Sequence, residues 1–323
     1  MKNNRILITG VSGYIGSCLA NFFKKKNFYG LDKSTPSSRV KIKNKNFFKC
    51  NLLNIKNLEK ILKEIKPDLI IHLAAKSTVS EKIKFRKYYL NNVVATKNLI
   101  YVMKKLKIKK IIYSSTAAVY KNKINSIKET DKIMPISDYG KTKLQAEKEI
   151  KKNIRNFVIL RFFNVCSAIK KPLIGENHKP ETHLIPLSVS NAILNKKIKI
   201  FGNDYLTKDG TCIRDYIHIK DICNAVLNSI IFLKKNKKGI FNLGNNKSIS
   251  NKDVINQISK ILDKKLKIQY ANKRKGDPST LICSPAYAKK KLKWIPKYST
   301  LKKILQDQIY WSRCLIKKNS NKF

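Results

Sequence analysis

The sequence predicts an α/β fold with a doubly wound parallel sheet and a smaller C-terminal substrate-binding domain. Short β-branched or apolar runs alternate with longer amphipathic stretches in the first half of the chain, and the second half is richer in loops. The runs that predict strands are Arg5–Thr9, Asn27–Leu31, Leu69–Leu73, Lys110–Ser114 and Phe157–Phe162. This alternation is typical of parallel strands covered by helices on both faces.

The texture of the chain changes after Asn164. Turn-forming residues become frequent there, namely Pro172, Gly175, Pro180, Pro186, Gly202 and Gly210. We therefore expect one domain over residues 1–165, rejoined by a segment near 212–232, and a second domain over residues 166–323. With 323 residues and 42% hydrophobic composition, the chain is long enough to bury the cores of both. The polar tail Lys317–Phe323 is expected to be disordered.

The formal net charge of +50 raises the question of a nucleic-acid partner. The lysines are spread along the chain, in runs such as Lys24–Lys26 and Lys289–Lys291, and do not gather in one arm. We expect only weak non-specific binding at low salt, although a basic nucleic-acid-binding scaffold remains the alternative from another functional class. The apolar run Ile6–Ile8 is too short for a signal peptide, and no run approaches the roughly 20 residues that span a bilayer. The prediction is a cytoplasmic protein without a membrane partner.

Cysteine and histidine usage argues against disulfides and metals. The seven cysteines are scattered and form no Cys-x-x-Cys pair, which favours reduced thiols. The four histidines (His72, His178, His183 and His218) have neither the i, i+4 spacing nor the cysteine partners of a zinc site. We therefore expect no metal, and a structural role for His72 at the end of its strand.

A glycine-rich turn joins the first predicted strand to a helix. Gly10, Gly13 and Gly16 lie three residues apart within Thr9–Gly16. Glycines at this spacing permit a tight turn, close approach of a pyrophosphate and close packing of the helix, whose N-terminus favours negative charge. Asp32 ends the next strand, where an acid can bind the adenosine ribose hydroxyls and repel a 2′-phosphate. The pattern predicts a Rossmann-type domain that binds NAD in preference to NADP; an ordinary turn acid is the alternative for Asp32.

Tyr139 and Lys143 are the candidate catalytic pair. They lie four apart in Tyr139-Gly140-Lys141-Thr142-Lys143, so on a helix they share one face. An ammonium beside a phenol should lower a tyrosine pKa that is ordinarily near 10. Such a tyrosine can take a proton from a sugar hydroxyl while hydride leaves the same carbon, with the Thr116 hydroxyl orienting the oxygen. A surface tyrosine on an amphipathic helix is the alternative.

Further motifs resemble the UDP-galactose 4-epimerase family of the extended short-chain dehydrogenase/reductase superfamily, across nearly the whole chain. These motifs are Arg161-Phe162-Phe163-Asn164, Ile174-Gly175-Glu176-Asn177-His178, Glu181-Thr182-His183-Leu184-Ile185-Pro186, Phe201-Gly202-Asn203-Asp204-Tyr205, Asp209 to His218, and Arg274-Lys275-Gly276-Asp277.

The resemblance implies two sets of binding residues. For the cofactor, NAD, it implies Gly10, Gly13, Tyr14, Ile15, Gly16, Asp32, Asn51, Leu52, Leu73, Ala74, Ala75, Ser77, Asn92, Ser114, Tyr139, Lys143 and Phe163. For the UDP-sugar it implies Thr116, Tyr139, Asn164, His183, Leu184, Phe201, Arg214, Tyr216, Arg274, Asp277 and Leu281, with both arginines on the diphosphate. Asn51 stands where the family usually has aspartate, and Ser77 where some members have lysine.

The residues after Thr116 indicate the reaction. Related dehydratases resemble Thr-Asp-Glu and decarboxylases Thr-Ser-Glu at this point, whereas this chain has Thr116-Ala117-Ala118. Without an added carboxylate, the expected chemistry is interconversion of UDP-galactose and UDP-glucose through a transient 4-keto sugar, with NAD regenerated. The resemblance also implies a homodimer. A 4-epimerase of another UDP-sugar, such as an N-acetylhexosamine, pentose or uronic acid, is the alternative. Leu281, where the family's tyrosine restricts the hexose pocket, leaves room for an N-acetyl group, although it could equally be a structural strand residue.

Overall fold

The computed structural model describes residues 5–23, 28–37, 40, 42–78, 83–171, 173–178, 180–235, 237–274 and 276–320. Of the residues used above, Lys24–Lys26, Asn27, Pro172, Lys275 and 321–323 lie outside the described part. The chain divides into two compact units, which are described separately. The first comprises Met1–Lys121, Asp131–Phe162 and Cys223–Phe241, and the second comprises Asn122–Thr130, Phe163–Ile222 and Asn242–Phe323.

A seven-stranded sheet forms the framework of the first unit. Its spatial order is β13-β6-β5-β4-β1-β2-β3. The strands are β1 (Ile6–Thr9), β2 (Phe28–Asp32), β3 (Phe47–Lys49), β4 (Leu69–His72), β5 (Lys110–Thr116), β6 (Asn156–Phe162) and β13 (Gly239–Leu243). Strands β1 to β6 pair in parallel throughout this order. The α/β parallel-sheet prediction is confirmed, with the five expected strands in place.

The order of the strands defines where a ligand can bind. The chain runs from β1 outward to β2 and β3, then crosses to β4 on the other side of β1. In open α/β sheets, ligands bind beyond the carboxyl ends of the strands at such a switch point. The glycine turn follows β1 and the segment Leu73–Ala75 follows β4, so both lie at this switch point.

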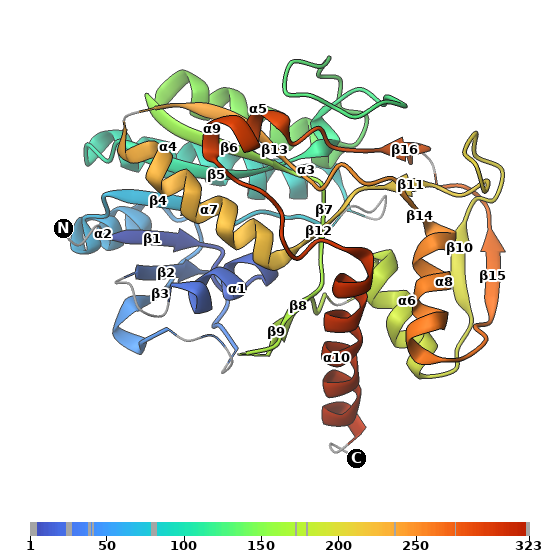
Figure 1. The fold of residues 1–323 in the computed structure, drawn as a ribbon. Helices are drawn as coiled ribbons and strands as arrows, with labels where there is room; N and C mark the ends of the chain where they lie inside the picture. The colour runs from blue at the N-terminus through green and yellow to red at the C-terminus, as the bar shows by residue number, and fades with distance from the viewer. Residues whose placement is uncertain are drawn as a thin grey trace. The chain divides into compact units, whose positions relative to one another are not determined.

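Helices cover both faces of the sheet. The helices are α1 (Tyr14–Phe22), α2 (Ile55–Ile65), α4 (Ala95–Lys105), α5 (Asp138–Asn153) and α7 (Ile219–Lys234), with short helices η1 (Asn44–Asn46), α3 (Phe85–Tyr88) and η3 (Ala117–Val119) and the π-helical segment η2 (Tyr89–Val94). Helices α2, α4 and α5 pack side by side, while α1 and α7 cross the front of the sheet (Figure 1).

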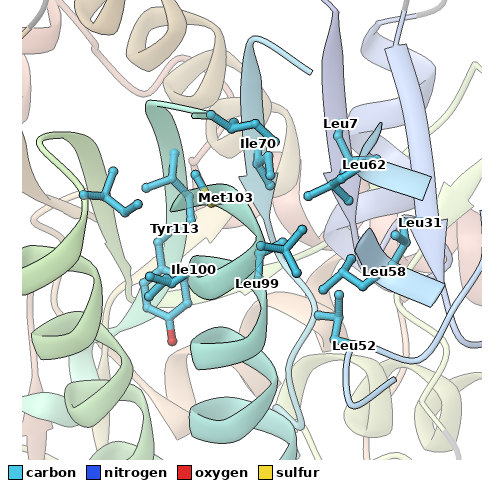
Figure 2. Packing of buried hydrophobic residues seen from close by; sticks show 14 of the residues in the cluster. Leu7, Leu31, Leu52, Leu58, Leu62, Ile70, Leu99, Ile100, Met103 and Tyr113 are labelled. Carbon is cyan, nitrogen blue, oxygen red and sulfur yellow. The ribbon is translucent and has the colours of Figure 1, made fainter. Parts of the chain in front are cut away.

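The core of the first unit lies between the sheet and α2 and α4 (Figure 2). Leucine, isoleucine, methionine and tyrosine side chains meet there. They come from strands (Leu7, Leu31, Ile70, Tyr113), from α2 (Leu58, Leu62) and from α4 (Leu99, Ile100, Met103). On α2 the apolar positions recur three and four residues apart, and they form the buried stripe of an amphipathic helix.

The second unit contains short strands and longer helices. The strands are β7 (Asn164–Cys166), β8 (Ala168–Ile169), β9 (Ile174–Gly175), β10 (Ile198–Phe201), β11 (Ile213–Arg214), β12 (Tyr216–His218), β14 (Ile249–Ser250), β15 (Ile268–Ala271) and β16 (Thr280–Leu281). The helices are α6 (Leu184–Ile193), α8 (Asn251–Leu262), α9 (Ala286–Leu292) and α10 (Leu301–Ser320). Helices α6, α8 and α10 share one apolar core.

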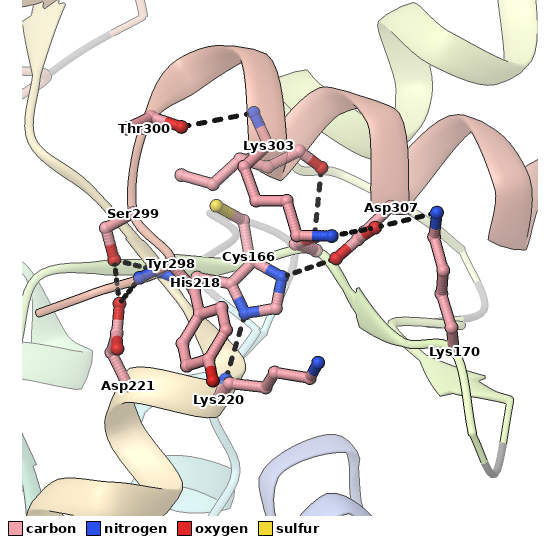
Figure 3. Close-up of polar contacts among 12 residues, drawn as sticks. Cys166, Lys170, His218, Lys220, Asp221, Tyr298, Ser299, Thr300, Lys303 and Asp307 are labelled. Carbon is pink, nitrogen blue, oxygen red and sulfur yellow. Dashed lines mark hydrogen bonds and ion pairs between the residues drawn. The ribbon is translucent and has the colours of Figure 1, made fainter.

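A buried polar group anchors α10 within the second unit (Figure 3). The His218 Nδ1 atom accepts from the backbone N–H of Lys220 at 3.0 Å, so the ring carries its proton on Nε2. That atom donates to Asp307 Oδ2 at 3.2 Å, and Lys303 Nζ contacts Oδ1 at 2.9 Å. These contacts hold the pKa of Asp307 at about 2, because hydrogen bonds from His218 and Lys303 outweigh its burial.

The expectation of a disordered tail at Lys317–Phe323 is wrong for its described residues. Helix α10 continues to Ser320. Lys317 and Lys318 are exposed in its last turn, where positive charge interacts favourably with the negative end of the helix dipole. Among the helices of the described residues, none is both long and apolar enough to cross a membrane.

Candidate active site

The turn after β1 can be built only with glycine at its key positions. Gly10 has a φ of +76°, and a Cβ there would lie 2.6 Å from the Ala74 backbone nitrogen. A Cβ on Gly16 would lie 2.1 Å from the Gly10 carbonyl oxygen. The glycines thus let the turn fold against the end of β4 and against α1 itself. The result is a tight turn at a helix N-terminus, where the backbone at the glycines can approach a dinucleotide pyrophosphate closely.

Asp32 lies at the end of β2 and faces this turn. Its Oδ2 accepts from the Ser12 backbone N–H and its Oδ1 from the Ser34 backbone N–H, both at 3.0 Å. Each carboxylate oxygen keeps a further lone pair, so the group can still accept from ribose hydroxyls. The turn and the acid are therefore brought together as the sequence predicted.

The other expected cofactor residues occupy the same end of the sheet. Leu73, Ala74 and Ala75 follow β4 and are half-buried; Tyr14 and Ile15 begin α1; Asn51 and Leu52 follow β3; Ser77 is exposed; and Ser114 lies in β5. Phe163 belongs to the second unit, where its N–H donates to the Leu243 carbonyl.

Asn92 lies in the π-helical segment η2 and is 1% exposed. Its Oδ1 accepts from the Lys76 backbone N–H at 2.8 Å, and its Nδ2 donates to Thr142 Oγ1 at 3.1 Å. Asn92 therefore connects the segment after β4 to α5, which it contacts at Thr142, the residue before Lys143.

His72 is a structural residue, as the sequence suggested. It is fully buried, with Nδ1 2.7 Å from Thr9 Oγ1 and Nε2 3.0 Å from Thr96 Oγ1. Burial and the positive charge of Lys143 lower its pKa to about 3, so the ring is neutral.

Tyr139 and Thr116 meet at the start of α5. Ser137 caps this helix by accepting from the Gly140 N–H at 3.1 Å. A Cβ on Gly140 would lie 2.3 Å from the Ala118 carbonyl oxygen, so glycine lets α5 approach the chain just after β5. The Thr116 side chain at the end of β5 then lies near enough to the Tyr139 phenol to lower its pKa.

The electrostatics of the pair differ from the expectation. Desolvation raises the pKa of Tyr139 to about 12, and the Thr116 side chain opposes this only in part. Burial therefore outweighs any lowering of the Tyr139 pKa by Lys143, whose Nζ lies 4.2 Å from the centroid of the Tyr113 ring. Burial lowers the pKa of Lys143 to about 7, despite the opposing charge of Glu147.

A buried ion pair that the sequence argument missed supports this helix. Glu147, one turn beyond Lys143, accepts from Arg161 Nε at 3.0 Å and Nη2 at 2.7 Å. It also accepts from the Ser115 hydroxyl, next to Thr116. Arg161 is 1% and Glu147 0% exposed, so the pair fixes α5 to β5 and β6 in a water-free core. The only sequence signal was Glu147 itself, four residues after Lys143 on the same face of the helix.

The expected diphosphate residues lie in the second unit with defined partners. The Arg274 guanidinium lies 3.9 Å from the centroid of the Phe201 ring. Arg214 Nη2 is 2.5 Å from Asp277 Oδ1, and its Nη1 donates to the Pro278 carbonyl at 2.7 Å. Arg214 therefore pairs with Asp277, and not with the neighbouring Asp215.

The remaining expected substrate residues are placed by short strands and by α6. Asn164 pairs with Tyr216 between β7 and β12, and Arg214 pairs with Leu281 between β11 and β16. His183 and Leu184 stand at the start of α6. Leu281 is half-buried, so it is not a residue of the deep core.

Comparisons with known proteins agree with this geometry. The profile of the NAD dependent epimerase/dehydratase family matches residues 6–244. The UDP-glucose 4-epimerase of Halalkalibacterium halodurans is 36% identical over 95% of both chains. The UDP-glucose 4-epimerase of Rhizobium meliloti is 35% identical over 92% of this chain and 94% of the relative.

Solved structures are similar over nearly the whole chain. A crystal structure of a UDP-glucose 4-epimerase has a TM-score of 0.90 at 35% identity, covering 96% of this chain and 98% of that one. The UDP-Glc/GlcNAc 4-epimerase of Campylobacter jejuni has a TM-score of 0.81 at 34% identity, covering 96% and 99%. The Bifidobacterium longum UDP-glucose 4-epimerase, solved with NAD+ and UDP, has a TM-score of 0.89 at 28% identity, covering 99% and 100%. The chain belongs to the NAD dependent epimerase/dehydratase family and, within it, to the UDP-glucose 4-epimerases.

Proposed function

We propose that this chain interconverts UDP-galactose and UDP-glucose by inverting C4 of the hexose, with Tyr139 as acid and base. The observation that carries the proposal is the position of the Tyr139 phenol at the start of α5, close enough to the Thr116 side chain at the end of β5 for that side chain to lower its pKa. A phenol so placed can take the proton of the 4-hydroxyl and later return it. Thr116 orients the 4-oxygen, and no carboxylate stands at positions 117 and 118 to drive elimination.

The turn after β1 and Asp32 are the proposed NAD-binding groups. When bound, NAD supplies the hydride acceptor at C4 and a positive charge beside the phenol. That charge opposes the burial that raises the pKa of Tyr139 to about 12. Lys143, whose pKa of about 7 lies close to neutrality, can hold or release a proton next to the tyrosine.

The second unit holds the UDP group in this proposal. Arg214 and Arg274 carry the positive charge for the diphosphate, and Phe201, Tyr216, Asp277 and Asn164 surround uridine. A guanidinium fork matches phosphate oxygens bidentately. Binding through the nucleotide leaves the hexose free to turn and receive hydride on its other face. We further propose a cytoplasmic homodimer without a nucleic-acid partner, which light scattering and a salt titration of RNA binding would test.

The decisive experiment is Tyr139→Phe, with Tyr101→Phe as the control at an exposed tyrosine. Tyr139→Phe should lower turnover of UDP-galactose by about 10²–10⁴-fold, because it removes the proton carrier. NAD should still copurify with the variant, and denaturation should release it unreduced. Turnover equal to that of the control would remove Tyr139 from the mechanism, and accumulation of free NADH would indicate a dehydrogenase.

Measurable activity on UDP-N-acetylglucosamine is a second candidate function. Leu281 is half-buried and smaller than tyrosine, and the similar Campylobacter jejuni enzyme is named for both sugars. Wild type and Leu281→Tyr would be assayed on both substrates. We expect the tyrosine to suppress the acetylated reaction selectively; no acetylated product from wild type would eliminate this candidate.

A further inference from the structure

Four side chains between β9 and α6 converge on one point in the second unit. They are Glu176, His178, Glu181 and His183, and one donor atom of each lies within 4.8 Å of all the others. The sequence argued against a metal from histidine spacing, but the pattern Glu-x-His-x-x-Glu-x-His places all four on one short loop. The loop is closed by β9 at one end and by α6 at the other.

The distances within this cluster are close to those that a bound ion imposes. His178 Nδ1 lies 3.0 Å and His183 Nδ1 2.5 Å from Glu176 Oε1. Glu181 oxygens lie 3.8 Å from His178 Nδ1 and 3.5 Å from His183 Nδ1. Tetrahedral zinc with bonds of about 2.0–2.1 Å separates its donors by roughly 3.3–3.4 Å. Shifts of under about 1 Å would bring these donors to coordination distance.

The Glu176 carboxylate gives independent support for a bound cation. The residue is 3% exposed, and its Oε2 has no hydrogen-bond partner in the described part of the chain. Both imidazoles meanwhile aim at the other oxygen, Oε1. A buried carboxylate oxygen without a partner is costly. A cation bound between the two histidines and the carboxylates would use both oxygens.

The backbone holds Glu176 in place before any ion binds. The Trp311 indole N–H donates to its carbonyl at 2.6 Å, and a Cβ on the preceding Gly175 would lie 2.7 Å from Trp311 Cδ1. On the other side, Glu181 Oε1 accepts from the backbone N–H groups of Thr182 and His183 at 2.8 and 2.9 Å. The cluster is therefore built into the fold.

We propose that Glu176, His178, Glu181 and His183 bind one divalent transition-metal ion, with zinc as the best match to two imidazoles and two carboxylates. Two carboxylates and two neutral imidazoles neutralise the charge of the ion. None of the four is a residue proposed for proton transfer, and only His183 is also among the expected UDP-sugar residues, so the ion acts by closing the loop between β9 and α6. Because the ligands come together only in the folded chain, metal binding should stabilise it.

The test is zinc binding by tag-free full-length protein stripped with a chelator. Zinc titration by calorimetry should give one site, and X-ray absorption of the loaded protein should show nitrogen and oxygen ligands without sulfur. Six of the seven free cysteines are buried, so a sulfur signal would indicate adventitious binding and overturn the proposal. Absence of tight binding by wild type would also overturn it.

Variants assign the ligands. Mutation of residues that only support metal ligands weakens metal binding by about 10–100-fold. Glu176→Gln and His178→Ala each remove a ligand, so each should weaken zinc binding by more than this and should abolish the zinc-dependent rise in Tm. Glu64→Gln makes the same chemical change at an exposed residue outside the cluster and should bind like wild type. Circular dichroism verifies folding, and Glu181→Gln replaces any variant that fails to fold. Wild-type affinity in the folded ligand variants would refute the site.

Discussion

Replacing Glu147 with glutamine should be one of the most destabilising single changes of a polar residue in the first unit. The carboxylate receives two guanidinium hydrogen bonds from Arg161 and one from Ser115, with both charged groups excluded from water. Glutamine is of similar size but presents an NH₂ group to the guanidinium and leaves its charge buried without a counter-charge. Breaking a buried pair in this way costs about 3–5 kcal/mol.

The matched control is Glu149→Gln on the same helix. Glu149 Oε1 contacts Lys97 Nζ at 3.2 Å, and the two side chains are 26% and 44% exposed. A solvated pair of this kind contributes about 0–1 kcal/mol. The two variants therefore make the same chemical change at sites that differ in burial.

Urea unfolding followed by circular dichroism measures both effects. We expect Glu147→Gln to lose at least about 2 kcal/mol more than Glu149→Gln. The double variant Glu147→Leu/Arg161→Met should recover most of that loss, because it removes both charges. Equal stability of the two glutamine variants, or a double variant no better than Glu147→Gln, would refute the assignment of the energy to the buried pair.

Three further predictions concern the phosphate turn, the ribose acid and α10. Gly16→Ala should abolish NAD binding or folding, measured by NAD titration and thermal unfolding, because a Cβ on residue 16 would lie 2.1 Å from the Gly10 carbonyl oxygen. Gly13→Ala should have a milder effect, because a Cβ on residue 13 would lie 3.3 Å from that oxygen. Asp32→Ala should raise the Kd for NAD by about 10–150-fold, the equivalent of about 1.5–3 kcal/mol, and an unchanged Kd in a fluorescence titration would contradict the ribose role. The pKa of Asp307 is held at about 2, below the ordinary value of 3.8, so its roughly 2 kcal/mol of stability is complete above pH 4 and is lost as the pH falls towards 2. Asp307→Asn should therefore reduce the difference between the urea unfolding midpoints at pH 6 and pH 3. An unchanged difference would argue against a contribution of the Asp307 carboxylate to stability.

The features that the sequence predicted are those with a local cause. Three glycines three residues apart predict a turn because only glycine tolerates the backbone and the close contacts at Gly10 and Gly16. The β-branched runs that became β1, β4, β5 and β6 predict strands because such runs favour a buried parallel sheet. Spacing of four residues is enough to place Tyr139 and Lys143 on one helical face.

The features that escaped prediction depend on tertiary contacts. Strand β3 has only three residues and β13 contains Gly239 and Asn242, so neither is a continuous β-branched run, and both are stabilised as neighbours in a sheet. The π-helical turns around Asn92 leave no local signature, because the hydrogen bonds of its amide reach residues 16 and 50 positions away. The direction of the Tyr139 pKa was missed for the same reason, because burial of the phenol is a property of the folded unit.

One face of α5 connects the stability of the first unit to its proposed chemistry. Tyr139, Lys143 and Glu147 follow one another at intervals of four, so they form a single stripe along the helix. At one end of the stripe Tyr139 lies near Thr116. At the other end Glu147 binds Ser115, the residue just before Thr116 in β5. Burial lowers the pKa of Lys143 to about 7, and the negative charge of Glu147 raises it in part. The same carboxylate also binds Arg161. A lysine whose pKa lies near the working pH is suited to proton transfer. The ion pair that holds α5 against the sheet thus also supplies the negative charge that raises the pKa of the Lys143 amine against the effect of burial.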